Sequence, residues 1–128
     1  MEHKTRLLVL LADDQANVRN ALRLLLEQEP DVEIIGEAAD ASGLLLLVTQ
    51  KPADVLLLDW ELPGLPSRYL LRLLRDERPS LHIIAMSSRP EAQQAAAEAG
   101  VATFLSKGAP PEVVLAALGR LQTGAEPK

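Results

Sequence analysis

Residues 52–59 read PADVLLLD, a short apolar run that ends on an aspartate, and this stretch decides the fold. An unbroken apolar run of strand length is typical of a central parallel strand that is buried on both faces. Residues 7–12 form a second such run, and it leads directly into Asp13. Because the carboxyl ends of parallel strands meet at one edge of a sheet, the two runs predict a parallel sheet with carboxylates at that edge.

The rest of the chain alternates between apolar runs and segments of helical periodicity, which is the pattern of repeated βαβ units. We expect strands at residues 7–12, 32–37, 55–58, 81–86 and 101–105. We expect helices at residues 16–29, 40–50, 67–77 and 91–99, and a last one that opens at residues 110–112. Right-handed crossovers then order the strands 2-1-3-4-5, a doubly wound, flavodoxin-like α/β fold with helices on both faces of the sheet.

Residues that favour helix ends stand at the expected boundaries. Asp40, Ser67 and Ser88 are placed to cap the second, third and fourth helices, since Asp and Ser are preferred N-caps. Gly100 is placed to end the fourth helix.

Length and composition indicate a single packed domain. The chain has 128 residues with 48% hydrophobic and 24% charged residues, which is close to an ordinary globular domain. We expect this domain to span residues 1–122, with residues 123–128 as a tail or the start of a linker. The absence of cysteine favours a reducing compartment, and only six apolar residues precede Asp13, so we expect a cytoplasmic protein without a membrane segment. The net charge of −5 argues against direct nucleic-acid binding by this domain.

The expected strand ends bring five chemically useful side chains to one edge of the sheet, namely Asp13, Asp14, Asp59, Ser87 and Lys107. Three carboxylates at close range repel one another, and oxygen ligands of this kind suit Mg²⁺. A carboxylate can also attack phosphorus to form an acyl phosphate. The pattern therefore predicts that Asp59 accepts a phosphoryl group beside a magnesium ion, while Lys107 and Ser87 bind the phosphoryl oxygens.

Each of these residues has a simpler interpretation when it is taken alone. Asp13 and Asp14 are as consistent with N-caps of the first helix as with metal ligands. Asp59 alone is more typical of a turn, and Lys107 of a solvated loop. Either Ser87 or the following serine is able to cap the fourth helix, and we assign the functional role to Ser87. Their joint placement at strand ends favours the site.

The motifs in this order resemble the receiver domain of bacterial two-component response regulators over nearly the whole chain. The matching segments are residues 11–14, 52–59, 62–64, 86–87 and 104–108. The resemblance implies a regulatory protein rather than an enzyme, with Mg²⁺ as its cofactor and a histidine kinase as its partner. It also implies residue roles: Asp59 as phosphoacceptor; Asp13, Asp14, Asp59 and the Glu61 backbone carbonyl as metal ligands; Ser87 and Lys107 as phosphoryl-binding residues; and Phe104 as the switch aromatic.

Residues 107–112 resemble the LuxR/NarL-type subgroup of these regulators. That resemblance implies homodimerisation on phosphorylation, and DNA binding through a C-terminal helix-turn-helix domain that the 128 residues do not include. Whether the chain is a standalone receiver or part of a longer regulator stays open. Three positions depart from the common pattern: Gly108 replaces a proline, residues 66–67 replace an Asp-Gly pair, and Ser88 replaces a small alanine.

Three other functions fit parts of the pattern. An aspartate-nucleophile phosphohydrolase usually carries a second acid two residues after the nucleophile, but Glu61 is followed by none of the later motifs of that class. A flavin protein needs hydroxyls and amides for a phosphate after the first strand, where Asp13 and Asp14 would repel it. A phosphorylation-independent interaction module is disfavoured by the complete acceptor set.

Overall fold

The structure is a computed structural model that describes residues 6–123. Its five parallel strands are β1 (Leu7–Ala12), β2 (Val32–Ala38), β3 (Val55–Asp59), β4 (His82–Ser87) and β5 (Thr103–Ser106). Its five helices are α1 (Ala16–Leu26), α2 (Ala41–Gln50), α3 (Ser67–Glu77), α4 (Ala92–Glu98) and α5 (Pro111–Thr123). The strand order is β2-β1-β3-β4-β5, so the predicted doubly wound fold is confirmed.

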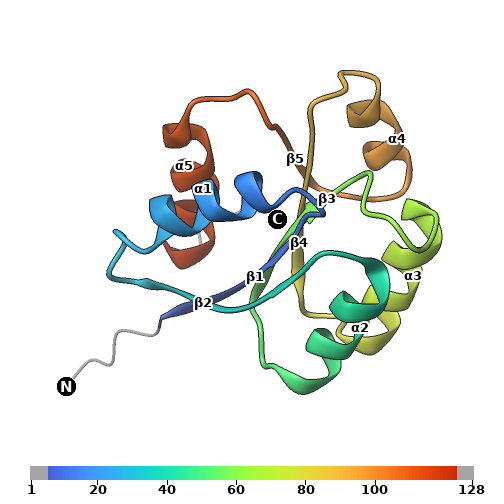
Figure 1. Cartoon of the computed structure of the whole chain (residues 1–128), viewed down its shortest axis with the longest axis horizontal. Coiled ribbons are helices and arrows are strands. Elements are labelled where there is room, and N and C mark those ends of the chain that lie inside the picture. Colours follow the sequence, from blue (N-terminus) through green and yellow to red (C-terminus); the bar gives the residue numbers. More distant parts are fainter. Residues whose placement is uncertain (1–5, 124–128) are drawn as a thin grey trace.

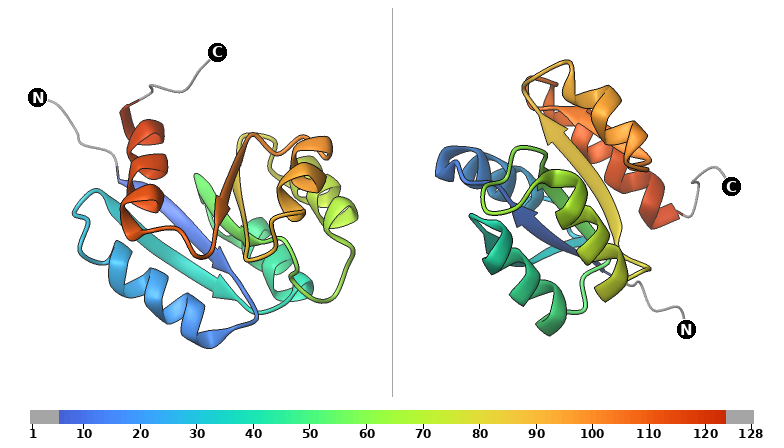
Figure 2. Two further views of the ribbon diagram at one scale, coloured as in Figure 1. Left: turned by 90° about the horizontal axis from the view of Figure 1, so that it is seen from above. Right: turned by 90° about the vertical axis from the view of Figure 1, so that its right-hand side faces the viewer.

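The helices form two layers, one on each face of the sheet (Figures 1 and 2). Helices α1 and α5 cover one face, and α2, α3 and α4 cover the other. Successive residues of a strand point to opposite faces, so Leu56 packs under α2 and α3 while Leu57 packs under α1 and α5. Every residue of β3 is buried, as its unbroken apolar sequence predicts.

Several predicted boundaries were wrong by one to three residues. Helix α1 ends at Leu26, three residues earlier than expected, because Leu26 is its last buried residue and Glu27 and Gln28 are exposed. Strand β4 starts at His82 and includes Ser87, and β5 starts only at Thr103. Helix α5 reaches Thr123, while residues 124–128 of the predicted tail lie outside the described part of the chain.

The predicted helix caps had mixed outcomes. Asp40 caps α2, because its side chain accepts the Gly43 N–H at 2.8 Å. The prediction for Ser67 was wrong: Pro66 precedes α3, and the Ser67 hydroxyl donates to the Trp60 carbonyl instead. The prediction for Ser88 was also wrong, since α4 follows Glu91, three residues later. Gly100 follows the end of α4 with φ +94°, a left-handed conformation that favours glycine.

Asp40 caps its helix and Ser88 does not, and this difference can be tested by measuring stability. We expect Asp40→Ala to lower the free energy of unfolding by about 1 kcal/mol, because it removes the acceptor of an otherwise unpaired helical N–H. Ser88→Ala, at an exposed position outside α4, is expected to change it by less than about 0.5 kcal/mol. Urea unfolding of both variants measures the difference, and equal losses would contradict the cap assignment.

Candidate functional site

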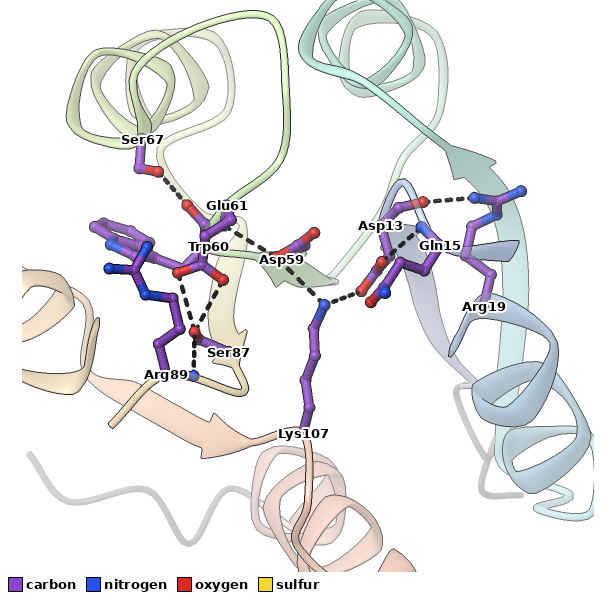
Figure 3. Close-up of polar contacts among 10 residues, drawn as sticks. All are labelled: Asp13, Gln15, Arg19, Asp59, Trp60, Glu61, Ser67, Ser87, Arg89 and Lys107. Carbon is purple, nitrogen blue, oxygen red and sulfur yellow. Dashed lines mark hydrogen bonds and ion pairs between the residues drawn. The ribbon is translucent and has the colours of Figure 1, made fainter. Parts of the chain in front are cut away.

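Four of the predicted site residues lie at the carboxyl edge of the sheet (Figure 3). Asp13 follows β1, Asp59 ends β3, Ser87 ends β4 and Lys107 follows β5. The strand register brings them level, since Asp59 pairs with Met86 and Ser87 pairs with Ser106. The parallel sheet therefore gathers at one edge side chains that are up to 94 residues apart in sequence, the separation of Asp13 from Lys107.

Three carboxylates form an acidic cluster at this edge. Asp13, Asp14 and Asp59 each offer an oxygen that lies within 4.8 Å of the other two. Asp13 and Asp59 are each only 4% exposed, whereas Asp14 is exposed. Backbone N–H groups orient the two buried carboxylates: Gln15 donates to Asp13 Oδ1 at 2.9 Å, and Glu61 donates to Asp59 Oδ1 at 3.0 Å.

The Lys107 ammonium connects the two buried carboxylates. Its Nζ atom lies 2.7 Å from Asp13 Oδ2 and 3.4 Å from Asp59 Oδ1. The Lys107 backbone N–H donates to the Ser87 carbonyl at 3.0 Å, which fixes the lysine next to β4. Burial lowers the pKa of Lys107, but the hydrogen bond to Asp13 and the charges of Asp59 and Asp13 outweigh it, so the net pKa is raised. The lysine is therefore held as a cation in the site.

Asp59 is in an environment that disfavours its charge. Burial raises the pKa of Asp59, and the neighbouring Asp13 carboxylate raises it further. The Glu61 N–H and the Lys107 ammonium lower it without cancelling the rise. The lysine therefore does not cancel the combined effect of burial and of Asp13 on the pKa of Asp59.

The donor set fits a magnesium ion. Asp13, Asp14 and Asp59 supply hard oxygen ligands, and the exposed side of Asp14 leaves room for the water molecules that Mg²⁺ keeps. Burial is the main cause that raises the pKa of Asp59, and a divalent cation would offset the further rise caused by the Asp13 carboxylate. The cofactor prediction is thus consistent with the arrangement of the residues. The ligand role of the Glu61 carbonyl stays a prediction.

Ser87 is buried and has partners that the sequence did not indicate. Its hydroxyl donates to the Glu61 carboxylate, with Oγ 2.9 and 3.0 Å from the two carboxylate oxygens, and it accepts the Arg89 N–H at 2.9 Å. Figure 3 shows Glu61 and Ser87 facing each other beside Asp59. The expected hydrogen bond from Ser87 to a phosphoryl group would therefore replace a bond to Glu61.

Phe104, the predicted switch aromatic, lies on β5 and is half-buried. It packs against the core cluster that contains Ala92 and Ala96 of α4. Because β5 and α4 are in contact, Phe104 lies on the strand beside that helix.

A family comparison agrees with this geometry. The sequence profile described as "Response regulator receiver domain" matches residues 9–119, most of the chain. The chain belongs to the response regulator receiver family. None of the helices of residues 6–123 combines the length and the apolar character that a membrane crossing requires.

Individual relatives of this receiver are longer proteins. The nitrate/nitrite response regulator NarP of Escherichia coli is 31% identical over 120 residues, which cover 92% of this chain and 56% of NarP. A protein-glutamate methylesterase/protein-glutamine glutaminase of Chromobacterium violaceum is 39% identical over 79 residues, 62% of this chain and 22% of that protein. The receiver thus spans about a fifth to about a half of these relatives.

Solved structures support the same assignment. The isolated REC domain of RcsB from Salmonella enterica serovar Typhimurium, with the phosphomimetic BeF3⁻, has a TM-score of 0.85 at 28% identity. The match covers 94% of this chain and 91% of that one. A LuxR-family response regulator from Aurantimonas has a TM-score of 0.83 at 25% identity, with 94% of this chain and 87% of that one covered. These similarities support the LuxR/NarL-type subgroup that residues 107–112 resemble.

Sequence reasoning missed two residues of the site in this receiver. The Glu61 side chain was considered only as the second acid of a phosphohydrolase, and not as the partner of Ser87. Arg19 of α1 donates to the Asp13 carbonyl, and its only signal in the sequence is its position on the first turn of the helix that follows the acidic pair.

The raised pKa of Asp59 predicts a gain in stability when its charge is removed. An acid whose pKa is raised by folding destabilises the folded state at pH 7, where it is ionised, and this cost disappears as the pH falls. We expect Asp59→Asn to unfold at a higher urea concentration than the wild type when a chelator removes divalent cations.

Asp54→Asn is the matched control, because Asp54 accepts the Leu8 N–H at 2.8 Å at the opposite end of β3. This variant is expected to unfold at a lower urea concentration than the wild type. A loss of stability in Asp59→Asn would contradict the conclusion that the folded state disfavours an ionised Asp59.

Proposed function

We propose that this receiver accepts a phosphoryl group on Asp59 from a histidine kinase in the cytoplasm. The observation that supports it best is the buried Asp59 carboxylate at the end of β3, next to Asp13 and the Lys107 ammonium. In the reaction, an Asp59 oxygen forms a bond to phosphorus. The bond from phosphorus to the leaving nitrogen of the kinase histidine breaks, and its electron pair goes to that nitrogen.

The other residues position and neutralise the phosphoryl group. Asp13, Asp14 and Asp59, with the Glu61 backbone carbonyl, would hold Mg²⁺. When bound, this ion supplies positive charge to the phosphoryl oxygens. Lys107 stabilises a phosphoryl oxygen as a point charge, since its ammonium is already held at Asp59. The domain catalyses only its own phosphorylation and dephosphorylation, so its role is regulatory.

Direct phosphorylation tests this function. Acetyl phosphate with Mg²⁺ is expected to add one phosphoryl group to the wild type, because the acceptor chemistry is contained in the domain. Asp59→Asn is expected to take up none. Asp54→Asn, the same substitution at the other end of β3, is expected to behave like the wild type in this assay. Intact mass spectrometry measures uptake.

If Asp59→Asn is phosphorylated at the wild-type rate, the site assignment is wrong. If the wild type takes up no phosphoryl group from any donor, the chain is a phosphorylation-independent interaction module. If the group is released at once as phosphate with many turnovers, an aspartate-nucleophile phosphohydrolase is the better description.

The signal would pass from Asp59 to α4 and β5. In the structure, the Ser87 hydroxyl is bonded to Glu61. A phosphoryl group on Asp59 competes for the Ser87 hydroxyl, and the movement of Ser87 makes space into which the Phe104 ring turns. The face formed by α4, β5 and α5 then changes shape.

The contacts of α4 suggest how this helix moves. It buries only alanines, Ala92 and Ala96, so little apolar area holds it to the sheet. Its C-terminal end is held more firmly, because Arg75 of α3 donates to the Ala99 and Gly100 carbonyls at 3.0 and 2.6 Å. We therefore expect the N-terminal end of α4, next to Ser87, to move most.

Amide hydrogen exchange tests this route. Beryllofluoride, a phosphoryl mimic, is expected to change exchange at the start of α4 and in β5 of the wild type. The change should be much smaller in Ser87→Ala and Lys107→Ala, which lack a ligand for the phosphoryl oxygens. Ser88→Ala removes the neighbouring exposed hydroxyl and should respond like the wild type. Equal responses in all four proteins would exclude the coupling route.

The output is proposed from the relatives. Solved structures describe an RcsB-DNA complex and RcsB dimers bound to DNA. By analogy, residues 1–122 form the receiver, residues 123–128 begin a linker, and phosphorylation favours a homodimer that controls transcription through a helix-turn-helix domain beyond the 128 residues. This output does not require the receiver itself to bind DNA.

A further inference from the structure

Arg19, on the first turn of α1, connects β2 to the acidic cluster. Its Nη1 atom donates to the backbone carbonyl of Asp13 at 2.5 Å, and its Nε atom donates to Glu37 Oε1 at 3.2 Å. Figure 3 shows the guanidinium lying against the Asp13 carbonyl, on the side of Asp13 away from Lys107. Arg19 therefore contacts the backbone of one expected metal ligand without entering the acidic cluster.

Glu37 of β2 fixes the orientation of Arg19. The Glu37 carboxylate is only 16% exposed and pairs with Arg19 through one oxygen and with Arg23 through the other. The Arg19 side chain is itself 21% exposed, so most of its surface is removed from solvent. A planar guanidinium with partners on two of its nitrogens is held in one orientation.

The Asp13 backbone is consequently held on both sides. Its N–H donates to the Ala38 carbonyl of β2 at 3.0 Å, and its carbonyl accepts from Arg19. That carbonyl belongs to the planar peptide that joins Asp13 to Asp14. Fixing its direction thus sets the position of the Asp14 backbone as well, and the Asp14 residue is exposed.

We propose that Arg19 is a positioning residue that orients Asp13 and Asp14 for magnesium binding. This inference rests on the proposed phosphoacceptor function and specifies how its metal site is built. Arg23 carries the same charge and also pairs with Glu37, but the bond to the Asp13 carbonyl comes from Arg19. Comparing variants of the two arginines therefore distinguishes a loss of the bond to the Asp13 carbonyl from a simple loss of positive charge.

Shortening Arg19 should leave the fold largely intact. A surface cavity of about 520 Å³ adjoins the guanidinium, lined by Arg19, Arg23 and residues 34–39. Water from this cavity is able to replace the lost donor at the Asp13 carbonyl. Water does not hold the carbonyl in one direction, so the expected defect is in metal affinity.

The test compares Arg19→Gln with Arg23→Gln in the whole chain. Mn²⁺ is the probe, because its free ion gives an electron paramagnetic resonance signal and it prefers the same oxygen ligands. Mg²⁺ competition then gives the magnesium affinity. We expect Arg19→Gln to raise both dissociation constants about tenfold, as loss of an outer-sphere partner typically does. Arg23→Gln is expected to change them by less than about twofold.

The possible outcomes distinguish a failure of the positioning role of Arg19 from a failure of the proposed metal site. Equal affinities in the wild type and Arg19→Gln, or equal losses in both variants, would overturn the positioning role. A wild type that binds neither ion would instead count against the metal site itself. If Arg19→Gln does not fold, Glu37→Gln replaces it, since it removes the carboxylate that orients Arg19. That variant should weaken Mn²⁺ binding about threefold relative to Arg23→Gln, and an unchanged affinity would again overturn the proposal.

Discussion

The ion pairs of Lys107 with two buried carboxylates are the constraint on which the rest of the site depends. Asp13 and Asp59 are both nearly inaccessible to solvent, and two such charges about 4 Å apart repel by roughly 4 kcal/mol at an effective dielectric of 20. The Lys107 ammonium, 2.7 and 3.4 Å from the two carboxylates, offsets that repulsion. It can do so only because β3, β4 and β5 end level with one another, and this alignment follows from the parallel register of the sheet.

The compensation is incomplete, and this gives the site its chemistry. The pKa of Asp59 stays raised by burial and by Asp13 despite the lysine. The ionised Asp59 therefore lowers the stability of the folded protein. A metal ion and a phosphoryl group act on the same charges: the cation offsets the excess, and the phosphoryl oxygens give Lys107 and Ser87 new partners. The Ser87–Glu61 hydrogen bond supplies the alternative state from which a switch can start.

The sequence was sufficient for the fold and for the location of the site, because both depend on apolar runs that end on Asp13 and Asp59. The sequence was less informative about helix starts and side-chain partners, which depend on tertiary contacts. The Ser67 hydroxyl bonds to the Trp60 carbonyl across a loop, and α4 begins at Ala92, four residues after Ser88, so neither serine caps a helix as its local preference predicts. The partners of Ser87 and the contact of Arg19 with Asp13 depend on side-chain directions that no periodicity encodes.

The most direct test of the central claim is to locate the phosphoryl group by chemical trapping. Borohydride reduces an acyl phosphate but not a free carboxylate, so it marks the acceptor with a mass change that peptide sequencing by mass spectrometry assigns to one residue. After treatment with a small phosphodonor and Mg²⁺, the account predicts a single reduced residue at Asp59. A mark at Asp13 or Asp14, or a phosphorylated protein without any reduced aspartate, would contradict it.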